Sequence, residues 1–169
     1  MINQKPNVHK MVICANVFVR KDGKYLLMKR SKDKKYAPNK IHPFGGKINQ
    51  NENPYEGAVR EIKEEVGIDI KNLKLEAVIL EKTDEKDLPV NWFIFHFSAD
   101  YDKGEIIVNE EGEALLLTPE EIKSSDLFPS VKSIIDNILN SHDGTVFTTN
   151  SYHGFETGMQ EISKNTCIV

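Results

Sequence analysis

Apolar and polar side chains alternate along several short segments of the chain, which is the pattern of strands with one buried face. Asp22 and Gly23 separate the first two of these segments and form a strong hairpin signal. The predicted strands are Met11–Arg20, Tyr25–Arg30, Phe44–Ile48, Leu73–Leu80, Val90–Ala99 and Glu113–Leu117. The alternation therefore predicts a sheet built from segments spread over most of the chain.

Helical spacing of apolar residues replaces this alternation after Pro54. Asn53 can cap a helix there, Glu56 can close the capping box, and Gly67 suits a left-handed end just after Val66. The side expected to pack carries Tyr55, Ala58, Val59, Ile62 and Val66. The same capping logic predicts a short helix from Thr118-Pro119-Glu120-Glu121, and apolar spacing predicts another over Ser130–Leu139. Strands with helices packed on them indicate an α/β sandwich.

The length of 169 residues and the 39% hydrophobic composition suit a single core. We therefore expect one domain over residues 1–169, in which residues 1–10 can be flexible. Two interpretations stay open for residues 142–162. Val146 and Phe147, with a second weak strand around Phe155–Ile162, predict either a hairpin that completes the sheet or a loose tail.

Composition narrows the partners and the compartment. The formal charge of −4 gives no attraction for nucleic acid polymers, and Lys32, Lys34 and Lys35 favour a solvated loop over a phosphate contact. Cys14 and Cys167 offer no disulfide framework, which is typical of a reducing compartment, and no apolar run approaches the roughly 20 residues of a membrane span. We expect a cytoplasmic monomer or homodimer without membrane or clear nucleic acid partners.

Three carboxylates occupy one side of the Pro54–Val66 helix. At about 100° per residue, Glu61, Glu64 and Glu65 fall within one arc of roughly 100°. Two like charges at i,i+4 destabilise a bare helix by a few tenths of a kcal/mol, about 0.3, and a bound cation would reverse that sign. Solvated acidic faces are common, so the helix alone leaves solvation and metal binding as alternatives.

The spacing of further residues before and after these glutamates decides between solvation and metal binding. Gly46, five residues, Glu52, seven residues and then Arg60-Glu61-Ile62-x-Glu64-Glu65-x-Gly67-Ile68 is similar to the whole signature of the Nudix hydrolases. The resemblance implies a Nudix-type α/β/α sandwich with a mixed β-sheet, and divalent cations, Mg²⁺ or Mn²⁺, bound by glutamates. The metal ligands it implies are Gly45 through its carbonyl, Glu61, Glu64 and Glu65.

The resemblance also assigns roles in the reaction. The catalytic set it implies is Glu52, Arg60, Glu61 and Glu64, with Arg60 orienting the glutamates by salt bridges. Hydrolysis of a phosphoanhydride needs a base for the attacking water, and Glu61 is our choice for that base. A further ligand is expected from the Asn109–Glu113 loop, where Glu111 is preferred and Glu110 and Glu113 stay open.

Outside this signature the chain resembles the MutT-like branch that includes oxidised-purine triphosphatases. Phe44-Gly45-Gly46-Lys47 and Asp126-Leu127-Phe128-Pro129 carry that likeness. The substrate contacts it implies are Gly46, Lys47, Tyr36, His42 and Phe128. The paired acids that read an oxidised purine in that branch fall on Ser130 and Val131 here, so the base cannot be named from the resemblance.

Each of these outlying contacts has a structural alternative. His42 can be a loop residue restricted by Pro43, and Tyr36 can simply pack. Trp92 is expected in the core or in a pocket wall, and His96 is expected to be a satisfied core histidine.

Three functions remain in order of preference. The first is a Mg²⁺-dependent hydrolase that cleaves a nucleoside triphosphate, such as 8-oxo-dGTP, into monophosphate and pyrophosphate. The second acts on ADP-ribose or dinucleoside polyphosphates, and the third is a nucleotide-binding module without turnover, which intact catalytic acids disfavour.

Overall fold

The computed structural model describes residues 11–34, 37–83, 91–107, 112–140, 143–153 and 160–169. The strands are β1 (Met11–Lys21), β2 (Lys24–Arg30), β3 (Ile41–His42), β4 (Phe44–Lys47), β5 (Asp69–Thr83), β6 (Asn91–Lys103), β7 (Gly112–Leu117), β8 (Val146–His153) and β9 (Gln160–Ile168). The helices are α1 (Pro54–Val66), α2 (Pro119–Ser124) and α3 (Pro129–Leu139). None of these three helices combines the length and the apolar character needed to cross a membrane.

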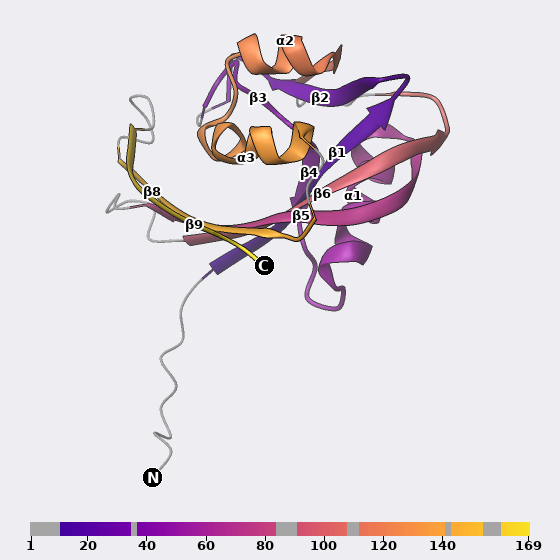
Figure 1. The fold of residues 1–169 in the computed structure, drawn as a ribbon. Coiled ribbons are helices and arrows are strands. Elements are labelled where there is room, and N and C mark those ends of the chain that lie inside the picture. The colour runs from indigo at the N-terminus through magenta and orange to yellow at the C-terminus, as the bar shows by residue number, and fades with distance from the viewer. Residues whose placement is uncertain (1–10, 35–36, 84–90, 108–111, 141–142, 154–159) are drawn as a thin grey trace.

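One mixed sheet organises these elements (Figure 1). Its main order is β3-β2-β1-β6-β5-β8-β9, while β4 pairs with β1 and β7 pairs with β2. The pairs β1–β6 and β5–β8 are parallel, and the other pairs are antiparallel. Asp22 and Gly23 both have positive φ, at 51° and 76°, as a tight hairpin turn requires. The predicted first hairpin and the mixed sheet are confirmed.

The sheet separates two apolar cores, because alternate residues of each strand point to opposite faces. On β1, Ala15, Val17 and Val19 join the core under α1, whereas Cys14 and Phe18 join the core under α2 and α3. Figure 1 shows α1 on one side of the sheet and the other two helices on the opposite side. This arrangement is the predicted α/β/α sandwich.

Helix α1 follows the predicted caps closely. The Asn53 side chain accepts hydrogen bonds from two backbone N–H groups, Glu56 closes the capping box, and Gly67 ends the helix with φ of 78°. At the margin of the predicted packing side, Tyr55 and Val59 are each 47% exposed, although the Tyr55 ring still packs edge to face on Phe97 with centroids 4.8 Å apart. Only the central line of the apolar arc, Ala58, Ile62 and Val66, is fully buried against the sheet.

The last two strands lie at one edge of the sheet. Strand β8 pairs in parallel with β5, and β9 pairs antiparallel with β8. Val146 is buried in the core under α3, and the Asn150 amide donates to the Ser133 hydroxyl of α3 at 3.0 Å. The second strand is described from Gln160 to Ile168, so it extends past the predicted end at Ile162, while residues 155–159 of the predicted range lie outside the described residues. Pairing with β8, rather than the weak apolar pattern, sets its register.

Strands β5 and β6 are also longer than predicted. Their mutual pairing runs from Asp69 opposite Lys103 to Glu81 opposite Trp92, with three shifts of register. Backbone hydrogen bonding extends a strand past the point where its apolar pattern ends.

His96 on β6 is buried as expected, with its ring 5.9 Å from that of Phe18. The expectation that its polar atoms are satisfied was wrong, because neither ring nitrogen has a hydrogen-bond partner among the residues that the structure describes. Burial, together with the nearby His42, lowers the pKa of His96 to about 3. The imidazole is therefore neutral in the folded protein at ordinary pH.

His96 should make the protein sensitive to mild acid. The unfolded chain protonates this histidine below pH 6.5, while the folded state does not until about pH 3, so the unfolded state binds more protons between these values. Stability is therefore lost as pH falls, by about 2 kcal/mol between pH 6.5 and 5. His96→Leu should remove that part of the slope in urea unfolding at pH 7 and pH 5. Phe18→Leu is the control and should lower stability similarly at both pH values; an unchanged slope in His96→Leu would refute the prediction.

The C-terminal strands should be required for stability. A chain that ends at Asn140 leaves the β5 edge unpaired and uncovers the core at the Val146 site, and exposed strand edges promote aggregation. We expect a lower unfolding midpoint and reduced solubility, measured by thermal unfolding and size-exclusion chromatography. A truncated chain that stays soluble, cooperatively folded and fully active would contradict this expectation.

Candidate active site

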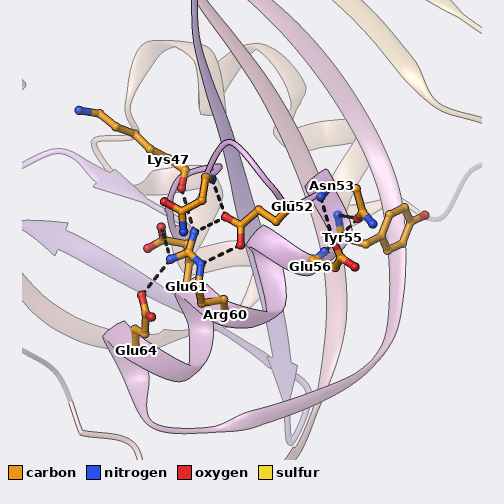
Figure 2. Close-up of polar contacts among 9 residues, drawn as sticks. Lys47, Glu52, Asn53, Tyr55, Glu56, Arg60, Glu61 and Glu64 are labelled. Carbon is orange, nitrogen blue, oxygen red and sulfur yellow. Dashed lines mark hydrogen bonds and ion pairs between the residues drawn. The ribbon is translucent and has the colours of Figure 1, made fainter.

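Helix α1 and the segment before it carry a cluster of acids around Arg60 (Figure 2). The Arg60 Nε and Nη2 groups donate to the two oxygens of Glu52 at 2.9 and 2.5 Å. Its Nη1 donates to Glu61 at 2.9 Å and to Glu64 at 2.8 Å, and Nη2 also donates to the Lys47 carbonyl at 3.0 Å. These bonds use all five N–H groups of the guanidinium. Arg60 therefore fixes its glutamate neighbours and ties the helix to the end of β4.

Charge and hydrogen bonding reinforce this arrangement. Hydrogen bonds from Arg60 and from the Asn49 backbone N–H lower the pKa of Glu52 to about 2. Hydrogen bonds to Glu52, Glu61 and Glu64 raise the pKa of Arg60 above its already high value. The Lys47 amino group points away from this cluster in Figure 2, so only its carbonyl takes part.

The backbone of β4 lies directly against two of the glutamates. The Gly45 N–H donates to Glu65 Oε2 at 3.0 Å. A Cβ on Gly46 would lie 2.6 Å from Glu61 Oε2, so only glycine leaves room for this carboxylate. Gly45 has φ of 142°, and a Cβ there would overlap the Ala15 carbonyl oxygen of β1. The two glycines therefore let helix, strand and carboxylates approach closely.

The donor set suits a hard divalent cation. Glu61, Glu64 and Glu65 could supply carboxylate oxygens and Gly45 a backbone carbonyl, and Glu61 and Glu64 both accept from the same Arg60 nitrogen. Over the described ranges, no three Asp, Glu, His or Cys side chains gather closely enough to hold a metal ion. In the described structure the Arg60 guanidinium binds Glu61 and Glu64, and the Gly45 N–H donates to Glu65.

A cavity of about 260 Å³ lies against β4. Of the predicted residues, its lining includes His42, Gly45, Gly46, Lys47 and Phe128. The rings of His42 and Phe128 meet edge to face with centroids 6.3 Å apart. Burial, together with the charge of Arg30, lowers the pKa of His42 to about 4, so the ring is neutral at pH 7. Strand β4 thus borders both the glutamate cluster and the pocket.

The remaining predicted residues have different outcomes. Tyr36, Glu110 and Glu111 lie outside the described residues. Glu113 is an exposed residue of β7, opposite Lys29 of β2. Trp92 lies in the pocket wall, which is one of the two places expected for it.

Sequence reasoning missed Glu81, which lines the same pocket and is only 3% exposed. Ser130 and Val131, where the resemblance lacks its paired acids, also line the pocket. A signal for Glu81 was present, since it continues the alternation of Ala77 and Ile79 into the core under α3. Acids are almost never fully buried unless they are paired, so a buried Glu81 needs an explanation.

The helix that carries the glutamates lies between two strands in the chain, and an arginine holds its carboxylates. Together with the neighbouring pocket, this arrangement on an α/β sandwich is typical of a hydrolase site. The sequence matches the NUDIX domain over residues 9–138, so the chain belongs to the NUDIX family and is a pyrophosphohydrolase of that family. This family generally uses divalent cations.

Solved structures share the fold at low sequence identity. A MutT protein from Bacillus halodurans has a TM-score of 0.79 at 23% identity, covering 92% of this chain and 97% of that chain. A MutT protein from Methanosarcina mazei Go1 has a TM-score of 0.62 at 22% identity, over 76% of this chain and 92% of that chain. A NUDIX hydrolase from Nitrosomonas europaea has a TM-score of 0.64 at 18% identity, over 76% and 88% of the two chains.

The close contact at Gly46 should be required for turnover. In Gly46→Ala, the new methyl group displaces the Glu61 carboxylate, the mobile end of a side chain, so the fold should persist while kcat falls about tenfold or more. Urea unfolding and steady-state hydrolysis measure the two effects. Gly23→Ala is the control, because it has open space around it but positive φ, and it should lose stability while keeping kcat. Full activity in Gly46→Ala would contradict the role of this contact.

Proposed function

We propose that the protein is a Mg²⁺-dependent hydrolase that cleaves a nucleoside triphosphate into a nucleoside monophosphate and pyrophosphate. The observation that carries this proposal is the cluster in which Arg60 binds Glu52, Glu61 and Glu64 beside a pocket that shares β4 with it. The acids suit the phosphate end of such a substrate through a cation, and the pocket suits its base.

The residues that would hold the cation are Glu61, Glu64 and Glu65, with the Gly45 carbonyl. Mn²⁺ would suit the same oxygen ligands. When bound, the cation neutralises phosphate oxygens and lowers the pKa of water. Several carboxylates near one another repel each other unless positive charge lies between them. Arg60 offsets only part of this repulsion, and the cation would offset the rest.

Glu61 is our choice for the base. Its side chain is 14% exposed, it touches the Gly46 backbone of the pocket wall, and Arg60 keeps its carboxylate oriented. In the proposed step, water forms a bond to phosphorus as the phosphoanhydride bond breaks, Glu61 takes the water proton, and pyrophosphate leaves. Glu64 is 60% exposed and therefore open to the cation and the phosphates.

Arg60 and Glu52 act as positioning residues in this scheme. The paired hydrogen bonds between them anchor the guanidinium, whose Nη1 then faces Glu61 and Glu64. A lysine could not reproduce this planar fork.

The reducing cytoplasm suits such an enzyme, since the buried Cys14 is a free thiol.

Product identity tests the proposal. Triphosphates, ADP-ribose and dinucleoside polyphosphates are incubated with the protein and Mg²⁺ at mildly alkaline pH, with and without a chelator. We expect pyrophosphate from at least one triphosphate and at least about a 100-fold lower kcat for Glu64→Gln, which loses a carboxylate of the cluster. Glu56→Gln is the matched control, because glutamine also closes a capping box and Glu56 lies outside the cluster.

Two outcomes would overturn the proposal. Organic monophosphates released from ADP-ribose, without pyrophosphate from any triphosphate, would move the assignment to linked diphosphates. Nucleotide binding without any metal-dependent turnover would assign the protein to a binding module.

A further inference from the structure

The pocket beside β4 contains a buried acid that the proposed reaction does not use. Glu81 of β5 is 3% exposed, and its Oε1 has no hydrogen-bond partner among the described residues. A hydrogen bond from the Ser130 side chain of α3 reaches the same carboxyl group. Burial raises the pKa of Glu81 to about 7, and the Ser130 hydrogen bond opposes that rise. A buried carboxyl group with an unused oxygen destabilises a fold, so its presence in a pocket points to a ligand that completes its hydrogen bonds.

A second acceptor lines the same pocket. The neutral ring of His42 has a hydrogen bond to the Pro43 backbone, where proline offers only its carbonyl oxygen. The ring nitrogen in that bond therefore carries the hydrogen, and Nε2, which is buried without a partner in the described part of the chain, keeps its lone pair. Within that part, Glu81 Oε1 and His42 Nε2 thus both lack a donor.

We propose that Glu81 determines the base specificity of the enzyme, and that its carboxylate accepts the adjacent N1–H and 2-amino N–H groups of a guanine base. This inference rests on the proposed function, since it names the base of that substrate. The oxidised base 8-oxoguanine keeps the same two donors.

The hydrogen-bond donors and acceptors of the other bases do not match this contact. Adenine and cytosine each place a ring acceptor beside the amino donor, and uracil and thymine place carbonyl acceptors on both sides of one N–H. Above a pH of about 7, where Glu81 is ionised, each would set a lone pair against its carboxylate. Only guanine among the common bases presents two adjacent donors, which match the two-oxygen geometry of a carboxylate.

The rest of the pocket suits a planar base with an anionic tail. Trp92 and Phe128 supply aromatic walls, and Arg30, whose guanidinium lies 5.9 Å from the Phe128 ring centre, adds positive charge. Lys47 lines the pocket on the β4 side, where the glutamate cluster begins. Ser130 occupies a position where the MutT-like branch carries a carboxylate. In this chain the acid beside that position comes from β5.

Metal-free binding of monophosphates tests the inference without turnover. Trp92 is the one tryptophan of the chain and lies in the pocket wall, so its fluorescence reports binding of dGMP, dIMP, dAMP and dCMP to the full-length protein. The wild type should bind dGMP about tenfold or more tightly than dIMP, which lacks the 2-amino group, because hydrogen bonds to a charged acceptor are strong. Glu81→Gln, which keeps the side-chain volume, should reduce the ratio to about threefold or less.

Two further variants separate the specific contact from general damage. Glu76→Gln changes another buried acid of β5, which accepts from Ser98 at 2.5 Å outside the pocket, and it should leave the dGMP to dIMP ratio unchanged. Ser130→Ala leaves the carboxyl group in place but removes the hydroxyl that holds it, and it should reduce the ratio in part. The ratio of kcat/KM for dGTP and dITP should follow the binding ratio in each variant.

Each outcome bears on one of the two proposals. Equal binding of dGMP and dIMP by the wild type, tighter binding of dAMP or dCMP, or an unchanged ratio in Glu81→Gln would overturn the role of Glu81. Selective dGMP binding that Glu81→Gln removes would support it even if no triphosphate were hydrolysed, and in that case the proposed hydrolysis alone would fail.

Discussion

The Arg60 guanidinium is the contact on which the arrangement of the candidate site depends. Its five N–H groups bind three carboxylates and the Lys47 carbonyl, so a single side chain joins the loop before α1, the helix and β4. Without it, Glu61 and Glu64 would repel each other on the helix surface. The partly buried Arg60 guanidinium also holds the Glu52 carboxylate, which accepts a further hydrogen bond from the Asn49 N–H. The result is that one guanidinium fixes the positions of the Glu52, Glu61 and Glu64 carboxylates.

Strand β4 connects this cluster to the pocket. It is short, it pairs with β1, and its two glycines allow both β1 and the α1 carboxylates to come within contact distance. Because the same backbone forms a wall of the pocket, groups bound in the two places would be separated by little more than one strand. A nucleotide has this layout, with a base at one end and a charged phosphate chain at the other.

The polar groups buried in the molecule differ in what they indicate. Glu76 is buried, but the Ser98 hydroxyl and Lys74 compensate its charge, so it behaves as a structural residue. Among the described residues, Glu81 and His42 keep atoms without hydrogen-bond partners inside a cavity, and sites where local rules are broken are commonly functional sites. His96 also has two nitrogens without a partner in that part of the chain, yet it lies in the core next to Phe18, where we expect a sensitivity to acid rather than a binding role.

Sequence by itself determined the elements whose signals are local. The caps of α1 follow from side chains that bond to backbone groups within three or four residues, and the Asp22-Gly23 turn follows from positive φ. The spacing from Gly46 to Ile68 was enough to predict the family, because one loop and one helix carry that box. Tertiary structure alone decided the start of β9, the exposure of Tyr55 and Val59, and the place of Glu81 beside Ser130. These features depend on pairing and packing between segments that are far apart in the chain, such as β5 with α3 and β8, and no local pattern records which distant partner a residue will meet.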